Sequence, residues 1–517
     1  MDDGVSNMAE GSNILFLMAD QLSPHALPFY GHPIVRAPHL QSIAERGTVF
    51  DSAYSNSPLC VPARMALMTG QFSSRVGVYD SGSELPATVP TMGHYLGLSG
   101  YETCLAGKCH FVGPDQRHGF EHRLNTDVEP ADFTMTADWT RPDDILDWYH
   151  TLKNVTAAGV AERSTHQEYD EETAYKATRW LFDWARKPDR RPFFLYVSFA
   201  HPHDPYVTPQ RYWDLYDHRS IDMPAVAPIP VDERDFFGKW LYRHYDRSEF
   251  TLTDEHVRTA RHAYYGSISF MDDLIGGILG ALQRIRVLDN TTVVFCADHG
   301  DMLGERGLWY KMAPYERATR VPLVIAPAGG QDACRVTENV SLVDLMPTLL
   351  ALAGGNTTVN PVEPIDGNSL LPLMLGDAAD WPDEAACELF FEGLAEPALM
   401  LRKGRYKYVR CTRQVELLFD MVADPDELHD LSSDPSHRHI LEALRGRVVA
   451  RWDFQSLTQD ILLSQRRRHL ILQSMAARGG HSWDFQPFED AAQLYYHDGS
   501  DWHAHDERTM LRFDGPS

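Results

Sequence analysis

The segment from Cys60 to Gly70 combines a thiol, a rigid proline and a cation within a few residues. It reads Cys-Val-Pro-Ala-Arg-Met-Ala-Leu-Met-Thr-Gly. Pro62 fixes its own φ angle and favours extended backbone at the residue before it, so Cys60 is expected to lead into a stiff bend. Arg64 then opens a helix-like run, where its planar guanidinium can hold an oxyanion beside the helix N-terminus. The alternative is a structural cysteine, because a free thiol commonly behaves as a small buried hydrophobe.

Four other short motifs carry side chains that could act on an oxyanion together with this segment. Alone, each of them could be an ordinary structural turn, because short motif matches occur by chance. Together they predict one chemical site. The motifs are Met18-Ala19-Asp20-Gln21, Gly107-Lys108-Cys109-His110, His201-Pro202-His203-Asp204-Pro205, and the run from Asp298 to Lys311.

The charged side chains of these motifs divide into two chemical sets. Asp20, Asp298 and His299 offer oxygen and nitrogen ligands, which suit a divalent cation and fit Mn²⁺ or Ca²⁺ without choosing between them. A histidine in the same site can supply the proton that a leaving group needs. Fixed positive charge for an oxyanion is available from Arg64, Lys108 and Lys311.

These motifs follow short apolar runs that are expected to be buried strands. Longer stretches with helical periodicity alternate with them, which indicates an α/β sandwich with a large, mostly parallel central sheet flanked by helices. Ligands bind outside the carboxyl ends of such strands, where Asp20, His201 and Asp298 lie. The expected strands are 13–18, 193–199, 292–296 and 321–325, and the expected helices are 39–46, 171–186, 255–285 and 342–353.

After Asp377 the sequence pattern changes to short apolar runs that are separated by turn residues. These runs predict a smaller antiparallel sheet backed by a helix. We expect strands at 388–391, 398–401, 406–410 and 417–420 and a helix at 440–452. The expected units are a catalytic domain over residues 12–380, an antiparallel-sheet and helix subdomain over 381–464, and a C-terminal tail over 465–517.

Composition limits the class of partner. The 517 residues include 43% hydrophobic and 23% charged side chains, as in ordinary globular proteins, and the formal net charge is −26. That charge argues against nucleic acid and against an anionic membrane surface as partners. The acidic start of the chain lacks the basic end and apolar stretch of a secretory signal, so we expect a cytoplasmic protein. Seven scattered cysteines indicate neither a disulfide framework nor a zinc site.

The pattern Cys60-x-Pro62-x-Arg64, followed by Thr69-Gly70, resembles the signature of type I sulfatases. The resemblance implies an alkaline-phosphatase-like fold, one divalent metal ion, and oxidation of Cys60 to formylglycine by a formylglycine-generating enzyme. In that family the hydrated aldehyde attacks the sulfur of a sulfate ester. The hydrate has one hydroxyl for this attack and another that helps to expel sulfate afterwards, an advantage over a serine nucleophile.

Further segments resemble the choline-sulfatase group of that family, and the resemblance extends from about Asn13 to about Tyr496. It implies hydrolysis of choline O-sulfate to choline and sulfate in the cytoplasm. It also implies a homo-oligomer, a tetramer, whose C-terminal tails reach the active site of a neighbouring copy. The segments are Ser57-Pro58-Leu59-Cys60, Gly113-Pro114-Asp115-Gln116, Trp148-Tyr149-His150, the His201 and Asp298 motifs, and Ser482-Trp483-Asp484-Phe485-Gln486-Pro487.

The resemblance also implies roles for individual residues. We expect His201 to protonate the departing alcohol and His110 to act as the base when sulfate is eliminated. Asp20, Cys60, Asp298 and His299 match the metal positions of the family, and Arg64, Lys108, His110, His201 and Lys311 match its sulfate-handling positions.

Recognition of choline needs aromatic faces and a carboxylate around a quaternary ammonium group. Glu392 is the carboxylate at the matching position, and His150 is a further expected contact. Met135 stands where the family typically has tryptophan, and the tail departs from the family after Ala492. Three alternatives therefore stay open: a sulfatase for another small alkyl or aryl sulfate, a related phosphate or phosphonate ester hydrolase, and a catalytically silent binder in which Cys60 remains a thiol.

Overall fold

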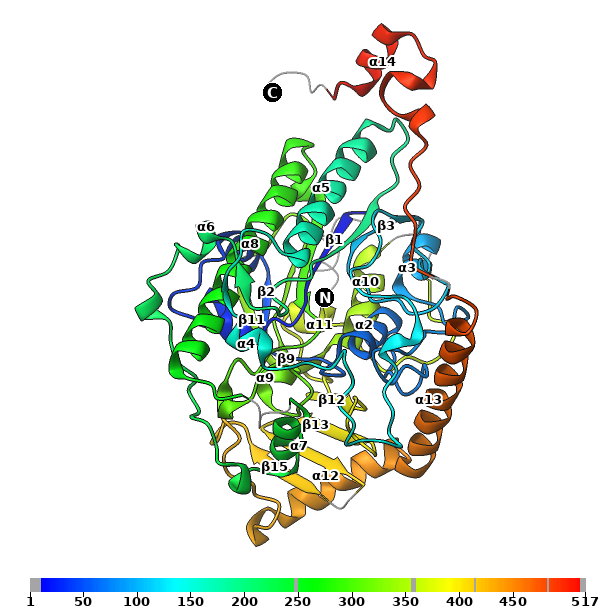
Figure 1. Cartoon of the computed structure of the whole chain (residues 1–517). Helices are drawn as coiled ribbons and strands as arrows, with labels where there is room; N and C mark the ends of the chain where they lie inside the picture. Colours follow the sequence, from blue (N-terminus) through cyan, green and yellow to red (C-terminus); the bar gives the residue numbers. More distant parts are fainter. Residues whose placement is uncertain (1–10, 246–249, 355–358, 413–414, 481–482, 512–517) are drawn as a thin grey trace.

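The computed structural model describes residues 11–245, 250–354, 359–412, 415–480 and 483–511 of the chain (Figure 1). The acidic start of the chain over residues 1–10, Ser482 of the C-terminal motif and residues 512–517 of the expected tail lie outside these ranges. No helix in the described ranges is both long enough and apolar enough to cross a membrane.

A nine-stranded mixed sheet forms the centre of the fold. Its strands are β1 (Asn13–Ala19), β2 (Thr48–Tyr54), β3 (Glu102–Gly107), β4 (His122–Arg123), β6 (Phe193–Ser198), β8 (Thr291–Ala297), β9 (Arg320–Val321), β10 (Leu323–Ala326) and β11 (Cys334–Ser341). The order along the sheet is β11-β2-β10-β8-β1-β6-β3-β4, and β9 pairs with β2.

Most neighbouring strands of this sheet run parallel, which confirms the expected fold class. The pairs β8–β1, β1–β6, β6–β3, β3–β4 and β2–β11 are parallel, whereas β10 is antiparallel to both of its neighbours. Every residue of β1, β6 and β8 is buried, because helices cover both faces and the strands are continuously apolar. Strands β2, β3 and β11 were not expected from the sequence, because polar residues interrupt their apolar pattern.

Helices flank the sheet on two sides. Figure 1 shows α5 and α8 on one side of β1 and α2 and α10 on the other. The helices before the C-terminal region are α1 (Pro38–Ala44), α2 (Cys60–Thr69), α3 (Met92–Leu98), α4 (Lys153–Thr156), α5 (Thr165–Arg186), α6 (Gln210–Trp213), α7 (Phe236–His244), α8 (Asp254–Arg284), α9 (Glu316–Thr319), α10 (Leu345–Ala353) and α11 (Leu371–Met374). A two-stranded parallel sheet joins β5 (Gly159–Val160) and β7 (Val207–Thr208).

Two helix starts differ from the sequence-based expectation. Helix α5 begins six residues earlier than expected, because the Ser164 side chain accepts a hydrogen bond from the Gln167 backbone N–H and caps the first turn. Helix α2 begins at Cys60, so the residue before Pro62 is helical and not extended as expected. Pro62 is tolerated there because the first-turn N–H groups have no acceptor within the helix.

The C-terminal region forms a separate antiparallel sheet in the order β12 (Glu384–Leu389), β13 (Ala398–Lys403), β14 (Tyr406–Cys411), β15 (Glu416–Asp420). Helix α12 (Arg438–Arg451) packs against β13 and β14, as expected. The first strand lies four residues earlier than expected. Helix α13 (Phe454–Ala476) crosses the boundary expected at 464/465, and Arg468 in that helix pairs with Asp80 at 2.5 Å. The proposed division into domains stays a prediction.

The central strands deliver the predicted motifs to one edge of the sheet. Asp20 follows β1 and Asp298 follows β8, and the Asp298 backbone N–H donates to the Ala19 carbonyl at 3.3 Å. On the other side of β1, the Asp20 N–H donates to the His201 carbonyl at 3.2 Å. Gly107 ends β3 with a φ of +91°, and a Cβ there would lie 1.9 Å from the Ser198 carbonyl oxygen. Only glycine fits this approach, which places Lys108 beside the other motifs.

Candidate active site

Four predicted ligands meet in one buried cluster. The ligand atoms of Asp20, Cys60, Asp298 and His299 all lie within 4.8 Å of one another, and all four residues are buried. The Cys60 Sγ is 3.2 Å from His299 Nε2 and 3.8 Å from Asp20 Oδ1. His299 Nδ1 lies 3.1 Å from the Gly300 carbonyl, which fits an N–H donated there and leaves Nε2 free to coordinate. Two carboxylates and an imidazole of this kind fit a divalent cation.

Arg64 holds the two carboxylates of this cluster in place. Its Nε donates to Asp298 Oδ2 at 2.9 Å and its Nη2 donates to Asp20 Oδ2 at 3.0 Å. Its Nη1 donates to the Lys108 carbonyl at 2.7 Å and to the Ser198 hydroxyl at 2.9 Å. The guanidinium is fully buried. Arg64 was expected to hold an oxyanion, whereas in the structure its donors bond to Asp20, Asp298, the Lys108 carbonyl and Ser198.

Lysine charges complete the electrostatics of the cluster. Lys108 Nζ lies 2.9 Å from Asp20 Oδ2 and 3.2 Å from Glu129 Oε1. Burial raises the pKa of Asp20, but the charges of Lys108, His203 and Arg64 outweigh it and hold that pKa well below its ordinary value. Burial alone would lower the pKa of Lys108, and the neighbouring Asp20 and Glu129 carboxylates raise it well above its ordinary value. Asp20 therefore stays ionised and Lys108 stays cationic.

Lys311 approaches the same cluster from the run after β8. Its Nζ donates to Gln21 Oε1 at 2.6 Å and lies 2.6 Å from His203 Nε2. Its pKa is raised, because the charges of Cys60, Asp20 and Asp204 outweigh the effect of burial. Gln21 and His203 received no role in the sequence analysis. Their positions beside Asp20 and His201 in two of the chemical motifs were the available signal.

His201 is oriented by a carboxylate that the sequence analysis missed. His201 Nδ1 lies 2.6 Å from Asp170 Oδ2, and the same carboxylate accepts the backbone N–H groups of Ala200 and His201. The His201 ring also contacts Phe270, with the ring centroids 4.8 Å apart. Asp170 is a fully buried acid on α5, one residue before the start expected for that helix at 171. The hydrogen bond at Nδ1 leaves His201 Nε2 available for proton transfer.

His110 has a different environment. It is buried, with a φ of +56°, and its backbone N–H donates to Asp127 Oδ2 at 2.7 Å. Neither ring nitrogen of His110 has a hydrogen-bond partner within the described ranges. A buried imidazole without partners is uncommon, so the ring is available for a ligand or a transferred proton.

Glu392 is a buried carboxylate on which the charge of Lys311 has a smaller effect than burial. Its Oε2 has no hydrogen-bond partner within the described part of the chain, and burial raises the pKa of Glu392 to about 7. The charge of Glu392 also helps to raise the pKa of Tyr149, after the larger effect of burial. Tyr149 contacts His244 at 4.6 Å between ring centroids. The residues on either side of Glu392 contact an aromatic side chain, because the Trp240 ring stacks on Phe391 at 5.0 Å between centroids and its Nε1 donates to the Gly393 carbonyl at 2.7 Å.

The other two expected substrate contacts are placed differently. His150 stacks on Tyr310 at 4.5 Å between ring centroids, and its Nδ1 lies 3.5 Å from Asp204 Oδ2. Met135 ends a short 3₁₀ helix (Phe133–Met135) and is half-buried. Among the described residues, no hydrogen bond, ion pair or ring contact joins Met135 to the chemical cluster. The structure thus links His150 to the run that carries Lys311 but does not link Met135 to it.

Comparison with known protein families identifies three matching regions. Residues 12–355 match the sulfatase family, residues 304–452 match the C-terminal region of N-sulphoglucosamine sulphohydrolase, and residues 459–509 match the C-terminal region of choline sulfatase enzymes. The expected resemblance to sulfatases and to the choline-sulfatase group is thereby confirmed.

Individual relatives agree with this result. The chain is 42% identical to a choline-sulfatase of Rhizobium meliloti over 93% of this chain and 95% of that protein. It is 27% identical to an arylsulfatase of Clostridium perfringens over 84% of this chain and 93% of that protein.

Solved structures share the fold. A phosphonate monoester hydrolase from Silicibacter pomeroyi has a TM-score of 0.69 and 24% identity, and the likeness covers 85% of this chain and 94% of that one. A putative sulfatase from Bacteroides thetaiotaomicron has a TM-score of 0.66 and 25% identity, with 87% and 93% covered. Because sequence and fold agree along nearly the whole chain, this protein belongs to the sulfatase family and is a sulfuric ester hydrolase.

Proposed function

We propose that this sulfatase hydrolyses choline O-sulfate to choline and sulfate. The observation that carries the proposal is Glu392, a buried carboxylate whose Oε2 has no hydrogen-bond partner in the described structure. The residues on either side of it, Phe391 and Gly393, both contact Trp240. A quaternary ammonium group needs this combination of negative charge and aromatic faces. The 42% identity to a choline-sulfatase of Rhizobium meliloti supports the same substrate.

The nucleophile is formylglycine, made from Cys60 by a formylglycine-generating enzyme. The place of Cys60 at the start of α2, facing His299 and Asp20, supports this assignment. Asp20, Asp298, His299 and the side chain at position 60 would hold one divalent ion, Mn²⁺ or Ca²⁺. When bound, such an ion acts as a Lewis acid and favours the deprotonated nucleophile.

The remaining residues bind the sulfuryl group and move protons. Lys108 and Lys311 stay cationic and supply positive charge to the sulfuryl oxygens. Arg64 acts by holding Asp20 and Asp298 in their positions. His201, oriented by Asp170, donates the proton that the departing choline oxygen needs. His110 takes the proton from the second hydroxyl of the hydrated aldehyde as sulfate leaves.

A homotetramer in the cytoplasm completes the proposal. Figure 1 shows α14 (Trp502–Thr509) at the end of a tail that extends past α5, and the Arg186 side chain of α5 donates to the Thr509 carbonyl at 2.8 Å. Phe488, Tyr495 and Trp502 in this tail are 87%, 67% and 69% exposed, which supports contact with another copy. All seven cysteines are free, as expected in a reducing compartment.

Cys60→Ala is expected to abolish turnover and leave the fold intact, because alanine cannot be converted to the aldehyde. In the wild-type protein, mass spectrometry of the peptide that contains residue 60 should show a mass below that of the cysteine form. Cys334→Ala, at a half-buried position outside the site, is the matched control and should keep both conversion and turnover. Appreciable turnover by Cys60→Ala would remove position 60 from the mechanism.

Asp298→Asn is expected to weaken metal binding more than about a hundredfold, because it removes a charged ligand from the cluster. Metal content by plasma mass spectrometry and the melting temperature with and without a chelator measure this effect. Asp301→Asn is the matched control: Asp301 is also buried, three residues further along, but does not belong to the cluster. Restoration of the stripped protein with Mn²⁺ or Ca²⁺ separates the two ions. Equal metal content in both variants would contradict the assignment.

His201→Ala is expected to slow choline O-sulfate hydrolysis by about 10²–10⁴-fold, the usual effect of losing a general acid. An activated aryl sulfate should lose much less, because its leaving group departs without a proton. The ratio of kcat/KM for the two substrates measures the difference. Asp170→Asn should produce a smaller loss of the same kind, since it disturbs the orientation of His201 only. Equal losses on both substrates would end the assignment of His201 as the acid.

The enzyme should prefer choline O-sulfate over the isostere in which a neutral tert-butyl group replaces the trimethylammonium group, and this preference should rise with pH. Glu392 has a pKa of about 7, so it is neutral below that pH and attracts a cation above it. We expect kcat/KM for choline O-sulfate to increase through pH 7 and to exceed that of the isostere by about tenfold or more at high pH. Glu392→Gln should remove both effects, whereas Glu388→Gln, at another buried carboxylate, should keep them. A pH-independent rate ratio near one would instead favour another small alkyl or aryl sulfate.

A further inference from the structure

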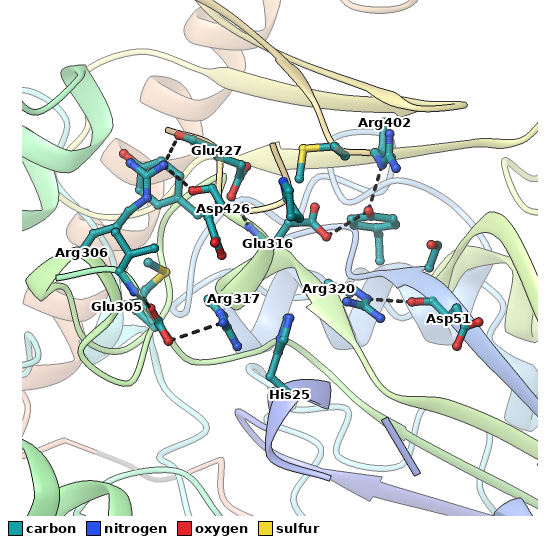
Figure 2. Close-up of a pocket in the computed structure, with 17 residues that line it drawn as sticks. His25, Asp51, Glu305, Arg306, Glu316, Arg317, Arg320, Arg402, Asp426 and Glu427 are labelled. Carbon is teal, nitrogen blue, oxygen red and sulfur yellow. Dashed lines mark hydrogen bonds and ion pairs between the residues drawn. The ribbon is translucent and has the colours of Figure 1, made fainter. Parts of the chain in front are cut away.

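A second group of cationic side chains surrounds a cavity away from the catalytic cluster. The cavity has a volume of about 210 Å³ and lies between the strand β2, the α9–β9 segment and the C-terminal sheet (Figure 2). His25, Arg317, Arg320 and Arg402 line it, and none of the proposed catalytic residues does. Arg317 keeps 22% of its side chain exposed, so solvent reaches the cavity. The volume far exceeds the ~10–15 Å³ that one water molecule needs.

The three arginines have few partners for their charge. Arg317 lies 3.4 Å from Glu305, whose carboxylate also accepts two backbone N–H groups. Arg320 Nε donates to the Asp51 backbone carbonyl at 2.7 Å, and Arg402 Nε donates to the Tyr54 hydroxyl at 3.0 Å. The buried Arg402 Nη1 has no hydrogen-bond partner within the described ranges. The charges of Arg320 and Arg402 also act on Glu316, and the unpaired Arg402 Nη1 remains available to a ligand.

The acidic residues at the cavity are largely committed to other groups. Glu316 and Glu427 share the buried Lys407, at 3.0 and 2.7 Å. The Asp51 carboxylate bonds to Arg335. Figure 2 shows Asp426 and Glu427 at one end of the cavity beside Arg306, and Arg320 and Arg402 towards the other end. Asp51 and Glu316 also lie towards that end, where Glu316 feels the charges of Arg320 and Arg402. Because Asp51 and Glu316 also pair with Arg335 and Lys407, the cations at this end outnumber the carboxylates.

His25 lines the same cavity as the arginines. Its pKa lies well below the ordinary value, first because it is buried and then because Arg317, Arg320 and Arg261 are nearby. Burial also lowers the pKa of Arg317, against the effects of Glu305 and Asp426. The lining thus gathers four arginines around one cavity, together with five carboxylates, in a chain with a formal net charge of −26. Buried charge of this kind is costly unless an opposite charge compensates it.

We propose that this cavity is a second oxyanion site, separate from the site at Cys60, and that it takes a tetrahedral dianion, either sulfate or inorganic phosphate. The planar forks of Arg317, Arg320 and Arg402 suit the several oxygens of such an ion, and a neutral His25 can donate one further hydrogen bond. Sulfate is a product of the reaction of this family, whereas phosphate would come from the surroundings. Competition between the two ions for the cavity shows which of them it prefers.

Crystallography of the full chain with selenate tests the site directly. Selenate is a tetrahedral dianion whose selenium gives an anomalous signal, so a bound selenate can be distinguished from a water molecule. We expect an anomalous peak among Arg317, Arg320 and Arg402, in addition to any peak at the catalytic site. A peak at the catalytic site alone, or no peak at any site, overturns the proposal. Soaks that add sulfate or phosphate to a fixed selenate concentration identify the preferred ion, and failure of both to displace selenate also overturns it.

Calorimetric titration with the preferred ion, at constant ionic strength, tests the residues. The carbonyls of Thr319 and Ala318 accept the backbone N–H groups of Ser55 and Gly300, so the segment that carries the arginines is bonded to the active-site backbone. A substitution in this segment could therefore change turnover indirectly, and for this reason binding is measured. Arg402→Gln and the partly exposed Arg317→Gln should each weaken binding at this site about tenfold or more. Arg405→Gln, at an exposed arginine paired with Asp420, is the matched control. Unchanged affinity in a folded Arg317→Gln protein refutes the assignment, even if Arg402→Gln fails to fold.

Discussion

The burial of two carboxylates side by side is the constraint on which the site depends. Asp20 and Asp298 are both fully buried at the ends of adjacent parallel strands, where two like charges would repel each other strongly. Arg64 bonds to both carboxylates at once, and Lys108 adds a second cation on Asp20. These cations hold the pKa of Asp20 well below its ordinary value and fix both carboxylates beside Cys60, so the arrangement links the folding of the sheet to the proposed chemistry.

Two glycines at strand ends in this arrangement have no room for a side chain. Gly107 lets β3 end against β6, because a Cβ there would overlap the Ser198 carbonyl. Gly300 plays the same part after β8, where a Cβ would lie 2.0 Å from the Arg317 carbonyl oxygen. The second contact also joins the active-site run to the segment that carries the arginines of the cavity. Residues 298–320 therefore contribute to both the active site and the cavity.

The histidines show how environment separates side chains of the same type. His201 bonds to Asp170 at one ring nitrogen, which fixes its orientation and leaves the other nitrogen for a leaving group. His110 is buried without a ring partner among the described residues, which suits a base that acts only when a substrate is present. His299 directs Nε2 towards Cys60 because Nδ1 faces a backbone carbonyl. Three proposed roles thus follow from three sets of neighbours.

Residue types and the buried central strands, though not their order in the sheet, were readable from the sequence, because apolar runs ending in Asp20, His201 and Asp298 are strong local signals of buried parallel strands. The same reading found the residues of the cluster, the fold class and the family. Neither the role of Asp170 nor the contacts of Arg64 could be predicted, because both depend on residues that are distant in the sequence. The oxyanion cavity is tertiary as well: Arg317 and Arg402 are far apart in sequence, and only the packing of the C-terminal sheet on the catalytic unit brings their charges together.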